Sequence, residues 1–279
     1  MARLESEYYS HMEFDPEHSR EVQRFYLPML AGRDPVLEIG CGRGEFLGLL
    51  REAGTEAEGV DLDEGMTEKA RADGFNVTQA DAIAFLHDDP PPGPYGGVYC
   101  AHLLEHLVPD EVVRLMAGVR RVLRPGGRFV AATPNPACYA VLTHDFWRDP
   151  THVRFYDIEV LEFFCRQAGL TVEATGGNPA NHPGPPPSFL ASEPEVHPGL
   201  ADAIEAAMRR VGPVRPPDSP EQPEPAQDLS WAHELGHLLN VVSERLQRTE
   251  EAVRNVHRAF ENLVLGMYQS NEIYVVAHA

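Results

Sequence analysis

The sequence lacks long apolar runs, cysteine pairs and, apart from Lys69, any lysine. No stretch approaches the roughly 18 apolar residues of a membrane span, and the N-terminus has no signal-peptide core. The four cysteines include no Cys-x-x-Cys pair, which favours reduced thiols over a disulfide framework. We therefore expect a soluble, cytoplasmic protein.

Basic residues are also scarce. Only 23 Lys and Arg residues stand against 43 Asp and Glu, which gives a net charge of −20 at pH 7. A field of this sign repels phosphate backbones and anionic lipid headgroups. Nucleic acids and membrane surfaces are therefore not expected as partners.

Strands and helices alternate along much of the chain. The pattern predicts seven strands: one at 36–39, a second that ends at residue 61, and five more at 76–78, 97–101, 128–133, 171–174 and 272–277. It predicts helices at 45–53, 66–72, 110–123 and 158–168. Such βαβ units predict an α/β fold with a doubly wound, mostly parallel, Rossmann-like sheet of seven strands. The expected organisation is a helical lid at 1–34, a core at 35–176, a linker or lid at 177–228, a long helix at 229–267 and a last strand at 268–279.

The segments before the last strand have unusual compositions. Residues 177–228 hold more than half of the 25 prolines, which indicates a poorly packed linker. Residues 229–267 contain no proline and carry an unbroken 4–3 apolar stripe: Leu235, Leu239, Val242, Leu246, Thr249, Val253, Val256, Phe260, Leu263 and Met267. This stripe predicts either a homodimeric coiled coil or a helix folded back onto its own domain.

A glycine-rich turn follows the first predicted strand. Gly40, Gly42 and Gly44 form Gly-x-Gly-x-Gly, not the Gly-x-Gly-x-x-Gly of dinucleotide sites. Glu38 precedes them by two residues, and its carboxylate would repel a diphosphate but attract a cation. The sulfonium and ammonium groups of S-adenosylmethionine (SAM) fit this position.

Three further side chains match the same ligand. Asp61 ends the second strand, where it can accept both ribose hydroxyls. Met66 can pack on adenine, and Asp81 after the third strand can accept from the adenine amine. With Leu123-Arg124-Pro125-Gly126-Gly127, residues 35–176 resemble class I SAM-dependent methyltransferases. The resemblance implies a cofactor site formed by Glu38, Gly40, Cys41, Gly42, Asp61, Leu62, Met66, Asp81, Ala82, Ala101 and His102.

Ionisable residues gather after the fourth and fifth predicted strands: His102, Glu105, His106, His144, Asp149 and His152. The arrangement resembles the divalent-metal site of small-RNA 2′-O-methyltransferases. That resemblance implies Glu105, His106 and His152 as ligands of Mg²⁺ or Mn²⁺, with His102 where that family has a glutamate. An extra imidazole weakens the case for a hard cation.

The Phe-Trp-x-Asp-Pro-Thr-His run at 146–152 resembles bacterial polysaccharide O-methyltransferases. This resemblance implies a carbohydrate acceptor, such as a methylated mannoside whose O1 receives the methyl group. Because a sugar hydroxyl is a weak nucleophile, we expect His144 to act as its base. We expect Tyr9, Trp147, Arg154 and Tyr156 to contact the sugar, although each is also consistent with loop packing.

Two other functions stay open at this point. One is metal-free methylation of a hydroxyl or amine in a small natural product, which a chelator would distinguish. The other is a non-catalytic SAM-binding module whose helix at 229–267 is the working part, which a turnover assay would distinguish. RNA methylation is disfavoured by the negative charge.

Overall fold

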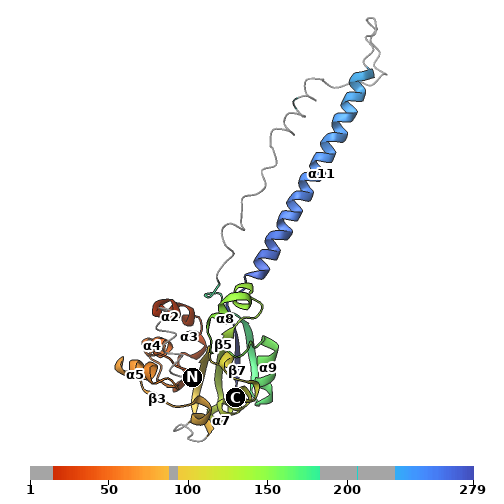
Figure 1. Cartoon of the computed structure of the whole chain (residues 1–279). Helices are drawn as coiled ribbons and strands as arrows, with labels where there is room; N and C mark the ends of the chain where they lie inside the picture. The colour runs from red at the N-terminus through yellow and green to blue at the C-terminus, as the bar shows by residue number, and fades with distance from the viewer. Residues whose placement is uncertain (1–14, 88–93, 183–205, 207–229) are drawn as a thin grey trace. The chain divides into compact units, whose positions relative to one another are not determined.

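The computed structural model describes residues 15–87, 94–182, 206 and 230–279 (Figure 1). The chain divides into two units, Met1–Gly184 with Met267–Ala279, and Pro185–Gly266. The first unit contains the sheet. Helix α11 (Ser230–Met267) belongs to the second unit except for its last residue.

The sheet has seven strands in the order β3-β2-β1-β4-β5-β7-β6. The first five, β1 (Val36–Ile39), β2 (Ala57–Asp61), β3 (Val77–Gln79), β4 (Tyr95–Ala101) and β5 (Leu123–Pro134), pair in parallel. Strand β7 (Glu272–His278) lies between β5 and β6 (Thr171–Gly177) and is antiparallel to both. The predicted α/β fold class, a mostly parallel seven-stranded sheet, is confirmed.

Helices cover both faces of this sheet, as α4 and α9 show in Figure 1. On one face are α3 (Leu27–Leu30) and α4 (Glu45–Glu52), with α2 (Pro16–Arg24) packed on α4. Helices α6 (Ala82–His87), α7 (Pro109–Val122) and α9 (Ile158–Gln167) pack on the other. Helix α5 (Glu64–Ala72) contacts β2 and β3. Short turns η1 (Leu104–His106) and η2 (Val141–Asp145) and helix α8 (Phe146–Arg148) complete the described part of this unit.

The central strands β1 and β4 are buried on both sides because helices cover both faces of the sheet. In β4, Val98 and Cys100 join the α7 side of the core, whereas Tyr99 points to the α4 side and packs against Phe46 with the rings tilted. Glu38 is the exception in β1, since it is a carboxylate within a fully buried strand. A buried acid in a central strand marks this end of the sheet as a site rather than simple core.

Two features differ from the sequence expectations. Helix α6 was not predicted, because its six residues are too few to show helical periodicity. Strand β5 begins five residues early, since the Arg124–Gly127 turn is taken into the strand as a bulge. The four cysteines are free and buried. Among the helices that the structure describes, none combines the length and the apolar character needed to cross a membrane.

Candidate active site

The loop after β1 exposes backbone at the carboxyl edge of the sheet. Gly40 and Gly42 have φ angles of +70° and +52°, where a side chain would be strained. A Cβ on Gly42 would meet no atom within 4 Å, so the space beside it is open. The Gly42 N–H donates to Oδ2 of Asp61 at 2.8 Å, which ties this turn to the end of β2. The turn can therefore hold a ligand against bare backbone.

A cavity of about 360 Å³ opens beside this turn, a size that suits a small organic ligand. All the cofactor-binding residues expected from the sequence line it: Glu38, Gly40, Cys41, Gly42, Asp61, Leu62, Met66, Asp81, Ala82, Ala101 and His102. Sequence reasoning missed other lining residues, among them Ser19 and Gln23 of α2, Arg43, Asp63 and Glu111. The sequence around Ser19 and Gln23 does not show that they line the cavity, because their position depends on how α2 packs against the rest of the unit.

Glu38 is the most unusual residue of the cavity wall. Its side chain is 3% exposed, and its Oε2 has no hydrogen-bond partner. Burial, together with the charge of nearby Glu45, raises the pKa of Glu38 well above its usual range. A cation in the cavity would supply the partner that the carboxylate lacks.

The two aspartates predicted to bind the nucleoside also have structural roles. Asp61 accepts the N–H groups of Gly42 and Asp63 at 2.8 Å each, and burial raises its pKa. Each of its oxygens keeps a second lone pair for a ligand hydroxyl. Asp81 is exposed and accepts the Ala84 N–H at 2.8 Å at the start of α6.

At the end of β4, His102 is held between two buried carboxylates. Its Nε2 donates to Oε2 of Glu272 at 2.7 Å, and its Nδ1 lies 3.3 Å from Oε1 of Glu105. Burial lowers the pKa of His102, but the hydrogen bonds and charges of Glu105 and Glu272 outweigh burial and raise it to about 10. His102 is therefore a fixed imidazolium at neutral pH and not a base.

Glu272 is a site-supporting residue that sequence reasoning missed. Besides His102, it accepts the Tyr26 hydroxyl at 2.7 Å and Asn178 Nδ2 at 2.6 Å. Burial raises the pKa of Glu272, but the hydrogen bond and charge of His102 outweigh burial and bring the pKa below its usual value. These three partners and Glu272 itself come from four separate segments, so no motif could have connected them.

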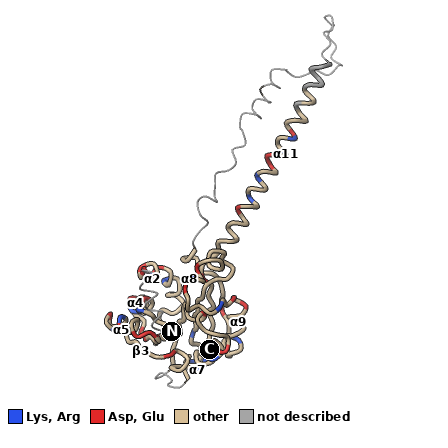
Figure 2. The backbone as a smooth tube through the Cα atoms, in the orientation of Figure 1, with Lys and Arg blue, Asp and Glu red and all other residues tan. Residues whose placement is uncertain are grey.

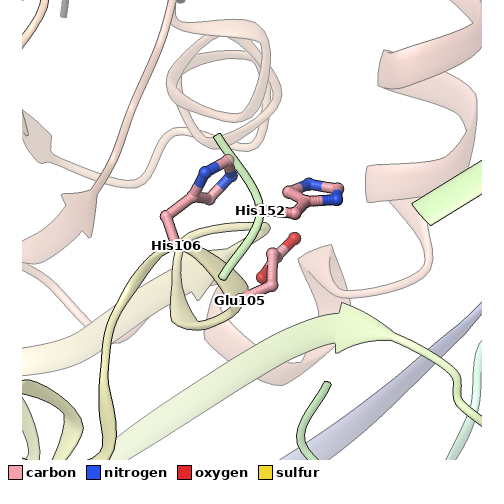
Figure 3. Close-up of side chains that lie close together, drawn as sticks. All are labelled: Glu105, His106 and His152. Carbon is pink, nitrogen blue, oxygen red and sulfur yellow. The ribbon is translucent and has the colours of Figure 1, made fainter. Parts of the chain in front are cut away.

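The three predicted metal ligands do come together (Figure 3). One ligand atom from each of Glu105, His106 and His152 lies within 4.8 Å of the others. The His152 Nδ1–H donates to the Phe146 carbonyl at 2.7 Å, which leaves its Nε2 available. Both oxygens of Glu105 already have neighbours, since Oε2 accepts the Thr133 hydroxyl at 3.0 Å and Oε1 faces the His102 imidazolium.

His106 has its tautomer set by its neighbours. The Thr151 hydroxyl donates to Oδ1 of buried Asp149 at 2.5 Å, so its oxygen must accept from Nδ1 of His106 at 3.0 Å. The proton of neutral His106 is then on Nδ1, and Nε2 keeps its lone pair. That Nε2 is buried without a hydrogen-bond partner, and His106 lines the cavity. Burial lowers its pKa, which favours the neutral ring.

The structure places two residues expected on the acceptor side away from the cavity lining. Tyr156 is 1% exposed, packs on Phe164 and donates its hydroxyl to the Leu107 carbonyl at 2.7 Å, so it belongs to the core and cannot stack on a sugar. His144, expected as the base, is not a cavity-lining residue. Its side chain is 70% exposed and pairs with adjacent Asp145, because η2 turns it to solvent.

The remaining predicted substrate residues are exposed or undescribed. Trp147 is 64% exposed and is held by a hydrogen bond from Nε1 to the Leu142 carbonyl at 2.8 Å. The exposed Arg154 guanidinium lies 5.1 Å from the centre of the Tyr156 ring. Neither lines the cavity. Tyr9 lies outside the residues that the structure describes.

A family profile described as "Methyltransferase domain" matches residues 10–175. The chain belongs to this methyltransferase family. Its relatives include the ubiquinone biosynthesis O-methyltransferases of Methylococcus capsulatus (32% identical over 173 residues, 54% of this chain and 69% of that protein) and Aromatoleum aromaticum (33% over 172 residues, 53% and 68%). A solved SAM-dependent methyltransferase from Archaeoglobus fulgidus has the same fold, with a TM-score of 0.66 at 22% identity over 97% of both chains.

The predicted SAM-dependent methyltransferase activity is thereby confirmed at the level of the class, whereas these relatives are not named polysaccharide methyltransferases. The cavity fits the cofactor that the class uses. Glu38 offers an unpaired buried carboxylate to a cationic group, and Gly42 leaves open space for close approach.

Proposed function

We propose that this methyltransferase transfers the methyl group of SAM to a hydroxyl oxygen of an aromatic small molecule, with His106 as the base. The observation that carries the proposal is the unpaired Nε2 of His106 at the wall of the cofactor cavity. SAM, when bound, supplies an activated methyl group on its sulfonium. The residues of the chain position this cofactor and prepare the acceptor oxygen.

His106 is suited to take the proton of a hydroxyl. Its Nδ1–H is fixed by Thr151, and Asp149 orients the Thr151 hydroxyl, so the free lone pair of Nε2 has a defined direction. Because burial lowers its pKa, the ring is neutral at neutral pH and ready to accept a proton. Thr151 and Asp149 are positioning residues in this account.

The aromatic acceptor is supported by two observations. The names of the relatives given above place their O-methylation in the biosynthesis of ubiquinone, a quinone. Residues 139–153, the segment that contains Thr151, also expose several large apolar side chains: Tyr139, Leu142, Trp147 and Val153. Such a surface suits an apolar acceptor.

A carbohydrate is the second candidate acceptor. Trp147 offers an exposed aromatic face of the kind that stacks on a sugar ring, and Arg154 offers exposed donors for sugar hydroxyls. With Tyr156 in the core, however, the sugar-binding set expected from the sequence is incomplete. The apolar character of the segment favours the aromatic acceptor.

A divalent cation at Glu105, His106 and His152 is the second candidate for activating the hydroxyl, because their ligand atoms converge. Two features favour the metal-free base. The negative charge of Glu105 is partly offset by the His102 imidazolium, which Glu272 shares, and two imidazoles are poor partners for Mg²⁺. We therefore propose that turnover proceeds without an added cation.

One screen separates these possibilities. The purified chain is incubated with methyl-labelled SAM and matched sets of phenols, sugars and amines, each with and without a chelator. We expect label in phenolic ethers, at equal rates in both conditions. Label on sugars alone would show that the acceptor is a carbohydrate, and label on amines would contradict O-methylation. A rate that falls with chelator and recovers with added metal would show that a cation takes part in the reaction.

A second experiment tests the positioning of His106. The Thr151→Val variant removes the hydroxyl that fixes the tautomer, and Thr151→Ser restores a hydroxyl. We expect Thr151→Val to lower kcat at unchanged SAM affinity, and Thr151→Ser to recover most of the loss. A Thr151→Val enzyme with the kcat of the wild type would show that the hydrogen bond between Thr151 and His106 has no role in catalysis.

A further inference from the structure

Helix α11 carries an exposed apolar stripe along its described length. Its residues step by three and four positions, and several are largely exposed within the chain, including Val256 at 70% and Leu263 at 62%. A helix of 38 residues is about 57 Å long. Helices of this kind gain most of their stability by burying an apolar face. The stripe therefore requires a covering surface.

The stripe has the register of a coiled coil. Leu246, Val253 and Phe260 occupy a positions, and Val242, Thr249, Val256 and Leu263 occupy d positions. The outer b, c and f positions are mostly polar, and Figure 2 shows charges of both signs interspersed along α11. A pattern of this length is complementary to itself.

We infer that α11 assembles with the α11 helices of further copies of this chain into a parallel, in-register coiled coil of three or four strands. The parallel direction follows from charge. Arg245 is at a g position and Glu250 at the e position five residues later, which is the pair that meets between neighbouring parallel strands. In this register every neighbouring pair of helices gains the same attractive contact, and the other flanking positions of the central repeats carry no competing fixed charge.

The strand number follows from the layers. The d positions at 242, 249 and 256 are β-branched, and the a positions at 246 and 253 are leucine and valine. β-Branched residues at d, with either leucine or a β-branched residue at a, favour trimers and tetramers over dimers. The g positions at 252 and 259 are alanine, which lets neighbouring helices approach on the wider contact surface of such bundles. The assembly therefore has more strands than the dimer expected from the stripe alone.

The first test is the mass of the full chain in solution. Light scattering should give at least three times 30.9 kDa. The double variant Leu246→Glu with Val253→Glu should give a single chain, because it places two carboxylates in the seam. The control Gln247→Glu with Asn255→Glu adds the same charge outside the seam and should keep the wild-type mass. A wild-type mass of one chain overturns the assembly, and a mass of two overturns the strand number.

Folding of the seam variant is checked separately, by far-UV circular dichroism and by SAM affinity. Both should match the control variant, since the changed side chains are not in the core of the sheet unit.

The second test is the strand direction. Val256→Cys places a thiol where it faces its own copy in a parallel, in-register bundle, and mild oxidation should then crosslink the chains. Arg245→Glu should weaken assembly, and adding Glu250→Arg should restore it. Failure of both the crosslink and the charge-swap rescue overturns the parallel register.

Discussion

Glu38→Gln should change cofactor affinity and protein stability in opposite directions. The carboxylate is buried, and its Oε2 is unpaired without a ligand. A cationic group of SAM in the cavity gains a charge-assisted interaction from it, worth about 1.5–3 kcal/mol. Replacing the carboxylate by an amide of the same shape should therefore raise the Kd for SAM by about 10- to 150-fold.

Without cofactor, the same change should not destabilise the fold. The wild-type carboxylate is desolvated and faces the charge of Glu45, and an amide removes that cost. We expect the Tm of the ligand-free variant to equal or exceed that of the wild type. A ligand-free Glu38→Gln protein with a Tm below that of the wild type, together with wild-type affinity for SAM, would contradict both expectations.

Calorimetric titration and thermal unfolding supply the two readouts. Glu52→Gln is a matched control, since it removes the same charge from α4 at an exposed ion pair with Arg20. That control should leave SAM affinity unchanged. Equal loss of affinity in both variants would assign the effect to net charge instead of the Glu38 contact.

Three further predictions follow from the site. Asp61→Ala should weaken SAM binding by about 1–3 kcal/mol, and calorimetry showing wild-type affinity would remove Asp61 from the site. Because burial lowers the pKa of His106, kcat should rise with pH through a value below 6.5 and be flat at neutral pH; a limb centred above 6.5 would point to another base. The pKa of His102 in the folded state is raised to about 10, so the stability that its ion pairs contribute is complete below pH 6.5 and is lost as pH rises toward 10. The free energies of unfolding of the wild type and His102→Asn, measured with denaturant, should therefore converge over this pH window. A constant difference would contradict the ion pairs.

The parts of the fold that follow from local pattern were predictable. Strand β1 was expected at the residues where it occurs, because an apolar run ends at a glycine turn. The cofactor residues were predictable for the same reason: most lie at the end of a strand or shortly after it, and the carboxyl ends of parallel strands meet at one edge. The cavity lining confirms that they come together.

The parts that depend on packing were not predictable. Glu272 reaches His102 only because β7 inserts between β5 and β6, far along the chain. Tyr156 and Trp147 looked equivalent in sequence, yet one is in the core and the other is exposed. His106 was expected only as a metal ligand, because the hydrogen bonds of Thr151 and Asp149 that define its tautomer exist only in the folded loop.

The role of His106 as the base is tested by the rate of methyl transfer of His106→Asn at saturating SAM and neutral pH, on the acceptor that the wild type uses. The account predicts a fall of about 10²–10⁴-fold at unchanged SAM affinity. His144→Asn changes an exposed histidine that does not line the cavity and should keep the wild-type rate. A wild-type rate in His106→Asn would contradict the account, and a large loss in His144→Asn alone would return the role of base to His144.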